Sequence, residues 1–129
     1  MRRLMSDDGG LKLPTKQAAF LVNGIATEIL LTHFGDRIFI AVTQLQKLGT
    51  IIHAASDKPV EIEGHPTFTV KILLGKDEPI LEVYARRLMD EISRSSTPDV
   101  PVLLAIALTD HSPACIQPVL DAIIDNKVW

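Results

Sequence analysis

The residues that come nearest to a chemical motif are Gly75 and Lys76, which follow an apolar run and precede a helical pattern. A strand, a glycine turn and a helix form the layout of a phosphate-binding loop, whose backbone amides wrap the phosphates. That loop also needs an earlier glycine and a hydroxyl residue directly after the lysine. Here Leu73 and Leu74 occupy the approach, and Asp77 replaces the hydroxyl. Because a carboxylate repels phosphate, we interpret Gly75 as a turn residue and Asp77 as a helix cap.

Other residue types that catalyse reactions or bind metals show no complete pattern. His111 and Cys115 are four apart and suit one helix face, but no third ligand is nearby. Asp110, His111 and Ser112 are triad residue types, yet triad members must meet through the fold. Glu28 lacks a partner carboxylate and is interpreted as an outward or edge residue. We therefore predict no catalytic residue, cofactor or metal site; the alternative is a small metal- or nucleotide-dependent enzyme using the glycine-lysine turn or the triad-like segment.

Apolar alternation and turn signals predict the elements that would position these residues. Five strands come first, over 17–22, 25–34, 37–44, 50–55 and 67–74. Asn23-Gly24, between the first two, is a strong hairpin signal. A helix over 78–94, a strand over 100–108 and a closing helix that begins at Ser112-Pro113 follow. Pro118 is expected to kink the closing helix or delay its start.

This order predicts an α+β fold with a six-stranded, mostly antiparallel sheet and two helices packed on one face, in the order β-β-β-β-β-α-β-α. The first four connections are short enough for antiparallel neighbours. Residues 1–15 are polar and contain glycine, so we expect a flexible N-terminal segment. Residues 16–129 then form a single domain of ordinary size.

The two helices are expected to cover only one face of this sheet, so the other face needs a second polypeptide. Six strands span roughly 25–29 Å, and two helices of about 10 Å each cover one face. The strands over 37–44 and 100–108 are nevertheless apolar on both faces, which is typical of strands that meet no water. We therefore predict an obligate dimer through the sheet.

Composition limits the classes of partner and the compartment. The net charge is −3, and no cluster of lysine or arginine appears, so nucleic acid is not an expected partner. The longest apolar run, over 100–108, is too short for a membrane span, which needs about 20 residues. No apolar signal segment follows the N-terminus, and one cysteine cannot form an intrachain disulfide. We predict an intracellular protein.

The longest irregular stretch, residues 56–66, is called the 56–66 loop. A loop of this length on a small, tightly connected sheet often has a binding role. A merely solvated connector is the alternative. Its acidic residues would favour a basic partner surface. The candidate partner-binding residues are Ser56, Asp57, Lys58, Glu61, Glu63 and His65.

Four stretches carry a resemblance to the proteasome assembly chaperone 3 family: VTQLQKLGTII (42–52), VKILLGKDEPILEVYARRL (70–88), VLLAIALTD (102–110) and the closing KVW. The similarity runs from about residue 16 to residue 129, and the 56–66 loop and Pro118 depart from it. The resemblance implies a non-catalytic chaperone of the cytoplasm, and also of the nucleus, with a six-stranded sheet. It implies a homodimer or a heterodimer with proteasome assembly chaperone 4. The implied role is to bind proteasome alpha subunits, chiefly alpha 5, and promote assembly of the 20S alpha ring.

Overall fold

The computed structural model describes residues 13–44, 49–57, 67–95, 100–109 and 112–129. In chain order the elements are β1 (Thr15–Val22), β2 (Ile25–His33), β3 (Ile38–Thr43), β4 (Thr50–Ser56), β5 (Phe68–Leu74), α1 (Pro79–Ser93), β6 (Val102–Ala107), the 3-10 helix η2 (Pro113–Cys115) and α2 (Ile116–Asp125). The predicted α+β class and element order are confirmed. The segment over 1–15 that was expected to be flexible lies largely outside the described residues.

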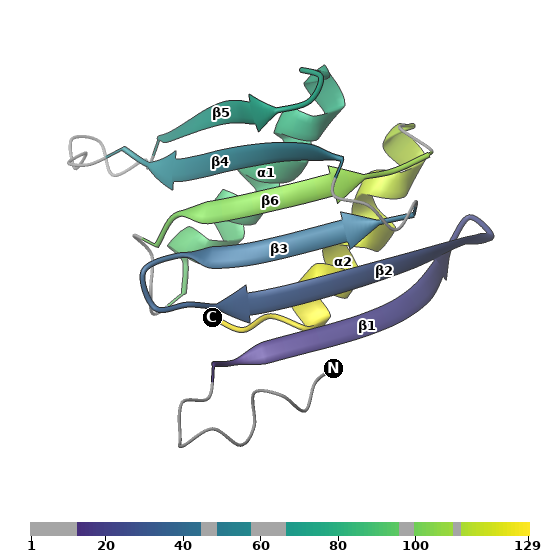
Figure 1. Cartoon of the computed structure of the whole chain (residues 1–129), viewed down its shortest axis with the longest axis horizontal. Coiled ribbons are helices and arrows are strands. Elements are labelled where there is room, and N and C mark those ends of the chain that lie inside the picture. Colours follow the sequence, from purple (N-terminus) through teal and green to yellow (C-terminus); the bar gives the residue numbers. More distant parts are fainter. Residues whose placement is uncertain (1–12, 45–48, 58–66, 96–99, 110–111) are drawn as a thin grey trace.

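The six strands form one sheet in the order β1-β2-β3-β6-β4-β5 (Figure 1). Four neighbouring pairs are antiparallel, and β3 with β6 is parallel. The prediction that the first four connections join neighbours is therefore wrong between β3 and β4, because β6 lies between them. β6 is apolar on both faces, and a central position covers more of such a strand than an edge does.

Both helices cover the same face of the sheet, as predicted (Figure 1). α1 packs against β4, β5 and β6, and its buried side includes Leu81, Tyr84 and Leu88. These side chains join alternate residues of the strands in one core. In the part of the chain that the structure describes, no helix is long and apolar enough to span a membrane.

Two prolines determine where the helices start. Pro79 is the first residue of α1, and it holds the preceding Glu78 in an extended conformation with φ −116° and ψ 134°. The N-cap is therefore Glu78, and the expected cap at Asp77 is wrong. Pro118 is the third residue of α2, where a helix has no use for the backbone N–H that proline lacks. The structure thus shows the delayed start, with η2 before it.

Candidate functional site

The sheet face away from the helices, called the open face, has an apolar centre that no described element covers (Figure 1). One row across the strands consists of Leu30, Ala41, Ala105 and Ile51, which lie in register. In the next row Phe39, Leu103 and His53 lie side by side. Phe39 and Leu103 remain half-buried, although the strand residues beside them that face the helices are fully buried.

Polar side chains border this apolar centre on two sides. Glu28 lies on β2, and Lys71 and Thr69 lie on the edge strand β5. Glu28 points outward, as the sequence indicated, but β2 is an inner strand and not an edge. An apolar centre with a polar margin is the usual composition of a protein–protein interface. The open face is therefore suited to a macromolecular partner.

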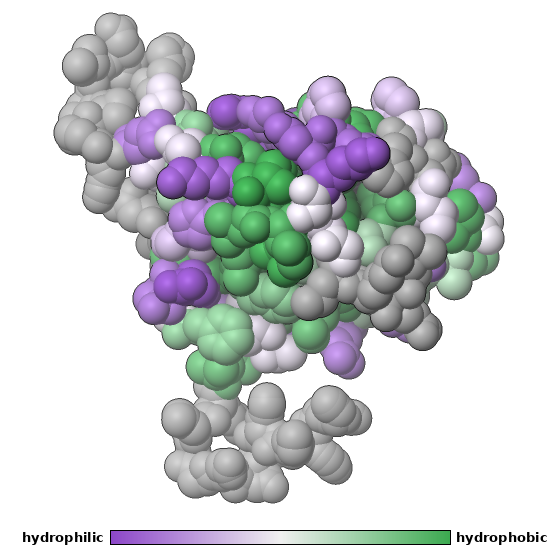
Figure 2. Space-filling model, turned by 45° about the horizontal axis from the view of Figure 1, so that its top comes forward, coloured by the Kyte–Doolittle hydropathy of each residue, from purple (hydrophilic) through white to green (hydrophobic). Residues whose placement is uncertain are grey.

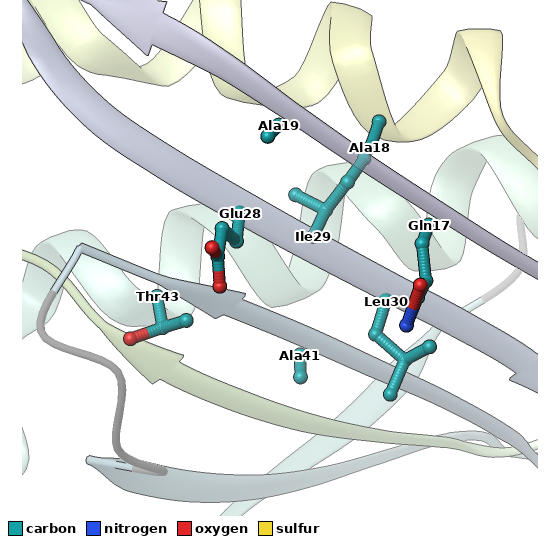
Figure 3. Close-up of a pocket in the computed structure, with 8 residues that line it drawn as sticks. All are labelled: Gln17, Ala18, Ala19, Glu28, Ile29, Leu30, Ala41 and Thr43. Carbon is teal, nitrogen blue, oxygen red and sulfur yellow. The ribbon is translucent and has the colours of Figure 1, made fainter. Parts of the chain in front are cut away.

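A hollow of about 600 Å³ lies on the open face beside Glu28 (Figure 3). Its small residues are Ala19 and Ala41, and Leu30 lies next to them. Gln17 and Thr43 add polar groups to the lining, with Ala18 and Ile29 completing it. Cross-strand pairing places Ala19 opposite Glu28, and Glu28 opposite the third strand's Thr43. The hollow has room for a side chain contributed by a partner.

A second apolar surface lies on the side of the molecule that carries β5 and α1. Figure 2 brings this side forward and shows an apolar patch bordered by hydrophilic residues. Leu73 and Leu74, at the end of β5, are 55% and 61% exposed, and Val83 of α1 is 38% exposed. Two adjacent leucines exposed to this extent at a sheet edge are a second candidate contact surface.

The structure describes only the first two of the predicted partner-binding residues. Ser56 ends β4 opposite Phe68, and Asp57 follows it. Lys58, Glu61, Glu63 and His65 lie outside the described residues, so their binding role stays a prediction.

Asp57 has a structural role at the base of the 56–66 loop. Its carboxylate accepts hydrogen bonds from the hydroxyls of Thr67, at 3.1 Å, and Thr69, at 2.5 Å. Its backbone N–H donates to the carbonyl of Thr67 at 2.9 Å. These contacts join the two ends of the loop. In the sequence, the signal for this role of Asp57 was the pair Thr67 and Thr69, which lie at alternate positions where the return strand starts.

The geometry at Gly75 supports the turn that the sequence indicated. Its φ is +105°, a backbone conformation that L side chains rarely adopt. A Cβ added there would lie 2.6 Å from Oγ1 and 2.8 Å from Cα of Thr50. Gly75 is thus accounted for by the turn and by the close approach of β4, and neither requires a phosphate.

The triad-like segment and the possible metal pair are only partly described. Asp110 and His111 lie outside the described residues, whereas Ser112 is the N-cap of η2. Cys115 is buried, and its Sγ accepts a hydrogen bond from Asn23 Nδ2 at 3.4 Å. Among the described residues no three His, Cys, Asp or Glu side chains come together as metal ligands do.

Gln44 connects three strands at one end of the sheet, a role that its sequence context did not reveal. Its Nε2 donates to Thr27 Oγ1 of β2 at 3.1 Å. Its Oε1 accepts from the backbone N–H of Thr109 at 2.8 Å, and its own N–H donates to the Ala107 carbonyl. Thr27 is fully buried, so this amide satisfies a polar group inside the core.

Comparison with known proteins gives consistent matches. The family model described as Proteasome assembly chaperone 3 matches residues 40–126. Proteins named "Proteasome assembly chaperone 3" are similar over most of their length. The protein from Bos taurus is 34% identical (95% of this chain, 99% of that protein), and the one from Nematostella vectensis is 38% identical (88% and 87%). The protein from Homo sapiens is 32% identical (89% and 93%).

A solved structure has a similar fold. A chain of "Crystal Structure of a Novel Chaperone Complex for Yeast 20S Proteasome Assembly" superposes with a TM-score of 0.68, covering 90% of this chain and 98% of that one. The two sequences are 15% identical, so this match concerns the fold alone.

Proposed function

Since this chain belongs to the proteasome assembly chaperone 3 family, we propose that it promotes assembly of the 20S alpha ring by binding alpha subunits, chiefly alpha 5. The family match over most of the chain is the observation that carries the proposal. Membership of this family itself gives the chain a chaperone role in proteasome assembly. A chaperone role is non-catalytic, which agrees with the prediction that the chain is not an enzyme.

The working form in this proposal is a dimer, made with a second copy of the chain or with proteasome assembly chaperone 4. Its support is the open face, where Phe39 and Leu103 remain half-buried and no described element covers them. A partner sheet packed about 10 Å away would remove this apolar area from water. The dimer would act in the cytoplasm and the nucleus, present a preformed surface to one alpha subunit and bias which neighbour docks next.

Affinity capture tests this function directly. The tagged full chain, expressed in cells at its natural level, is expected to co-purify with alpha subunits, alpha 5 foremost, identified by mass spectrometry. Native mass measurement of the eluate then separates a homodimer from a heterodimer. Recovery of the chain with neither an alpha subunit nor a sister chaperone would overturn the proposal.

The 56–66 loop is the proposed contact with the alpha subunit. Glu61→Lys with Glu63→Lys is expected to reduce alpha-subunit capture several-fold, because reversing charge at an interface margin slows association. Asp57 is left intact, since its carboxylate holds the loop base. Asp121→Lys with Asp125→Lys, two exposed positions on α2, makes the same charge change elsewhere. Equal capture by both double variants would remove the loop from the interface.

A further inference from the structure

Among the described strands, the open face carries one glutamate and one lysine, which lie on opposite sides of its apolar centre. Glu28 lies on β2, and Lys71 lies on β5. Strands β3, β6 and β4 separate them. Both side chains are exposed, and neither forms an ion pair with another described residue. A chain that covers the open face would bury these charges, and each would then need an opposite charge.

The hollow described above gives Glu28 a site that a long side chain can enter. Ala19 and Ala41 leave space there because they end at Cβ, and Leu30 offers an apolar wall (Figure 3). The Glu28 carboxylate lies in the same lining. An aliphatic stem over the alanines with a cation at the carboxylate would satisfy both parts of this site. These are the two parts of a lysine side chain.

The symmetry of a pair of identical chains decides which charge meets which. A two-fold axis that runs broadly along the strands exchanges the two sides of the sheet, so that β5 of one copy lies over the β1–β2 side of the other. Lys71 then approaches Glu28 of the partner chain. An axis across the strands leaves each side over itself and sets Glu28 against Glu28. Opposite charges therefore favour the first arrangement.

We propose that the hollow beside Glu28 receives Lys71 from a second copy of this chain, so that two such pairs form in each dimer. This inference rests on the proposed function in one respect, that a second copy covers the open face. Glu28 lies in the row of Thr43, whereas Lys71 lies in the row of His53. Because these residues lie two rows apart, the two-fold axis must be tilted from the strand direction, and the two sheets cross obliquely.

Lys71 is the only lysine or arginine that the described strands place on the open face. Lys16, the other strand lysine, pairs with Leu31 and so belongs to the opposite face. Helix α1, which carries Arg86 and Arg87, lies on the other face of the sheet (Figure 1). A homodimer that pairs the Glu28 carboxylate with a strand ammonium on the same face therefore uses Lys71.

The test is charge exchange in the purified full-length chain, read by sedimentation equilibrium. Glu28→Lys and Lys71→Glu are each expected to raise the dimer dissociation constant by about tenfold or more, because each homodimer then contains two like-charge contacts. An equimolar mixture of Glu28→Lys and Lys71→Glu is expected to have a dimer dissociation constant near that of the wild type, since both contacts are attractive in the mixed dimer. Different tags on the two variants identify that dimer by native mass measurement.

The neutral variants Glu28→Gln and Lys71→Gln are the matched controls. Each of their homodimers lacks both charge pairs, whereas their mixed dimer regains one of the two, so their mixture is expected to recover only part of the lost affinity. Thermal unfolding of each variant, expected within a few degrees of wild type because both sites are exposed, separates lost association from lost folding. A dimeric wild type without recovery in the charge-reversed mixture would overturn the pairing alone. If Glu28→Lys bound the wild-type chain more tightly than the wild type binds itself, the two-fold axis would run across the strands. That result would also overturn the pairing. A monomeric wild type would overturn both this inference and the homodimer.

Discussion

Leu103→Asp is expected to abolish dimer formation while the monomer stays folded. Leu103 lies on β6 near the middle of the open face, in register with Phe39 and His53. In the monomer it is half-buried, so an aspartate there still reaches water. In the dimer its carboxylate would be buried without a partner, and the dissociation constant should rise more than about 100-fold. Sedimentation equilibrium measures the loss of the homodimer, and co-purification of proteasome assembly chaperone 4 measures the loss of the heterodimer.

The neighbouring residue provides a control that depends on strand alternation. Leu104 is 1% exposed and faces the helices, so Leu104→Asp is expected to unfold the monomer. Val83→Asp makes the same kind of change on α1, on the other side of the sheet, where the side chain is exposed, and should change the dissociation constant little. A Leu103→Asp protein that remained a dimer would show that the open face is not the interface.

Gly75→Ala is expected to lower the free energy of unfolding by about 3 kcal/mol, the sum of backbone strain and overpacking. The strain arises because φ is +105°, and the overpacking because the new Cβ meets the backbone of Thr50 at 2.8 Å. Urea denaturation measures the loss. ATP is expected to shift the thermal unfolding of neither the variant nor the wild type, because Asp77 and the missing hydroxyl leave no phosphate site.

Gly35→Ala is the matched control for this substitution. Its φ is +100°, nearly that of Gly75, but no atom lies within 4 Å of the added Cβ. The expected loss is therefore backbone strain alone, about 1 kcal/mol. Equal losses at the two positions would contradict the role of the Thr50 contact, and a stabilising shift with ATP would reopen the nucleotide interpretation.

Much of the local structure was predictable because it depends on neighbours in the chain. Asn23-Gly24 predicted the first hairpin, and both residues adopt positive φ, +52° and +81°. Alternating apolar residues placed β2 and β3 to within a residue or two. Pro118 predicted a kinked helix or a delayed start, and the structure shows the delayed start, because the missing N–H of proline acts on its own turn.

Strand pairing and the roles of single polar residues required the tertiary structure. The position of β6 between β3 and β4 depends on contacts far apart in sequence, and no local pattern specifies them. Asp57 was predicted as a binding residue, but its hydroxyl partners, Thr67 and Thr69, are ten and twelve residues away. Gln44 reaches Thr109 across 65 positions.

By itself the sequence determined the elements, the face of each strand that is apolar and the excess of apolar surface over the cover that two helices provide. These follow from side-chain period and covalent geometry, which act over a few residues. Only the tertiary structure decided that Glu28 and Lys71 share the open face on opposite sides of an apolar centre. The reason is physical: strand order is set by which long-range pairings bury the most apolar area together, and that is a property of the whole sheet.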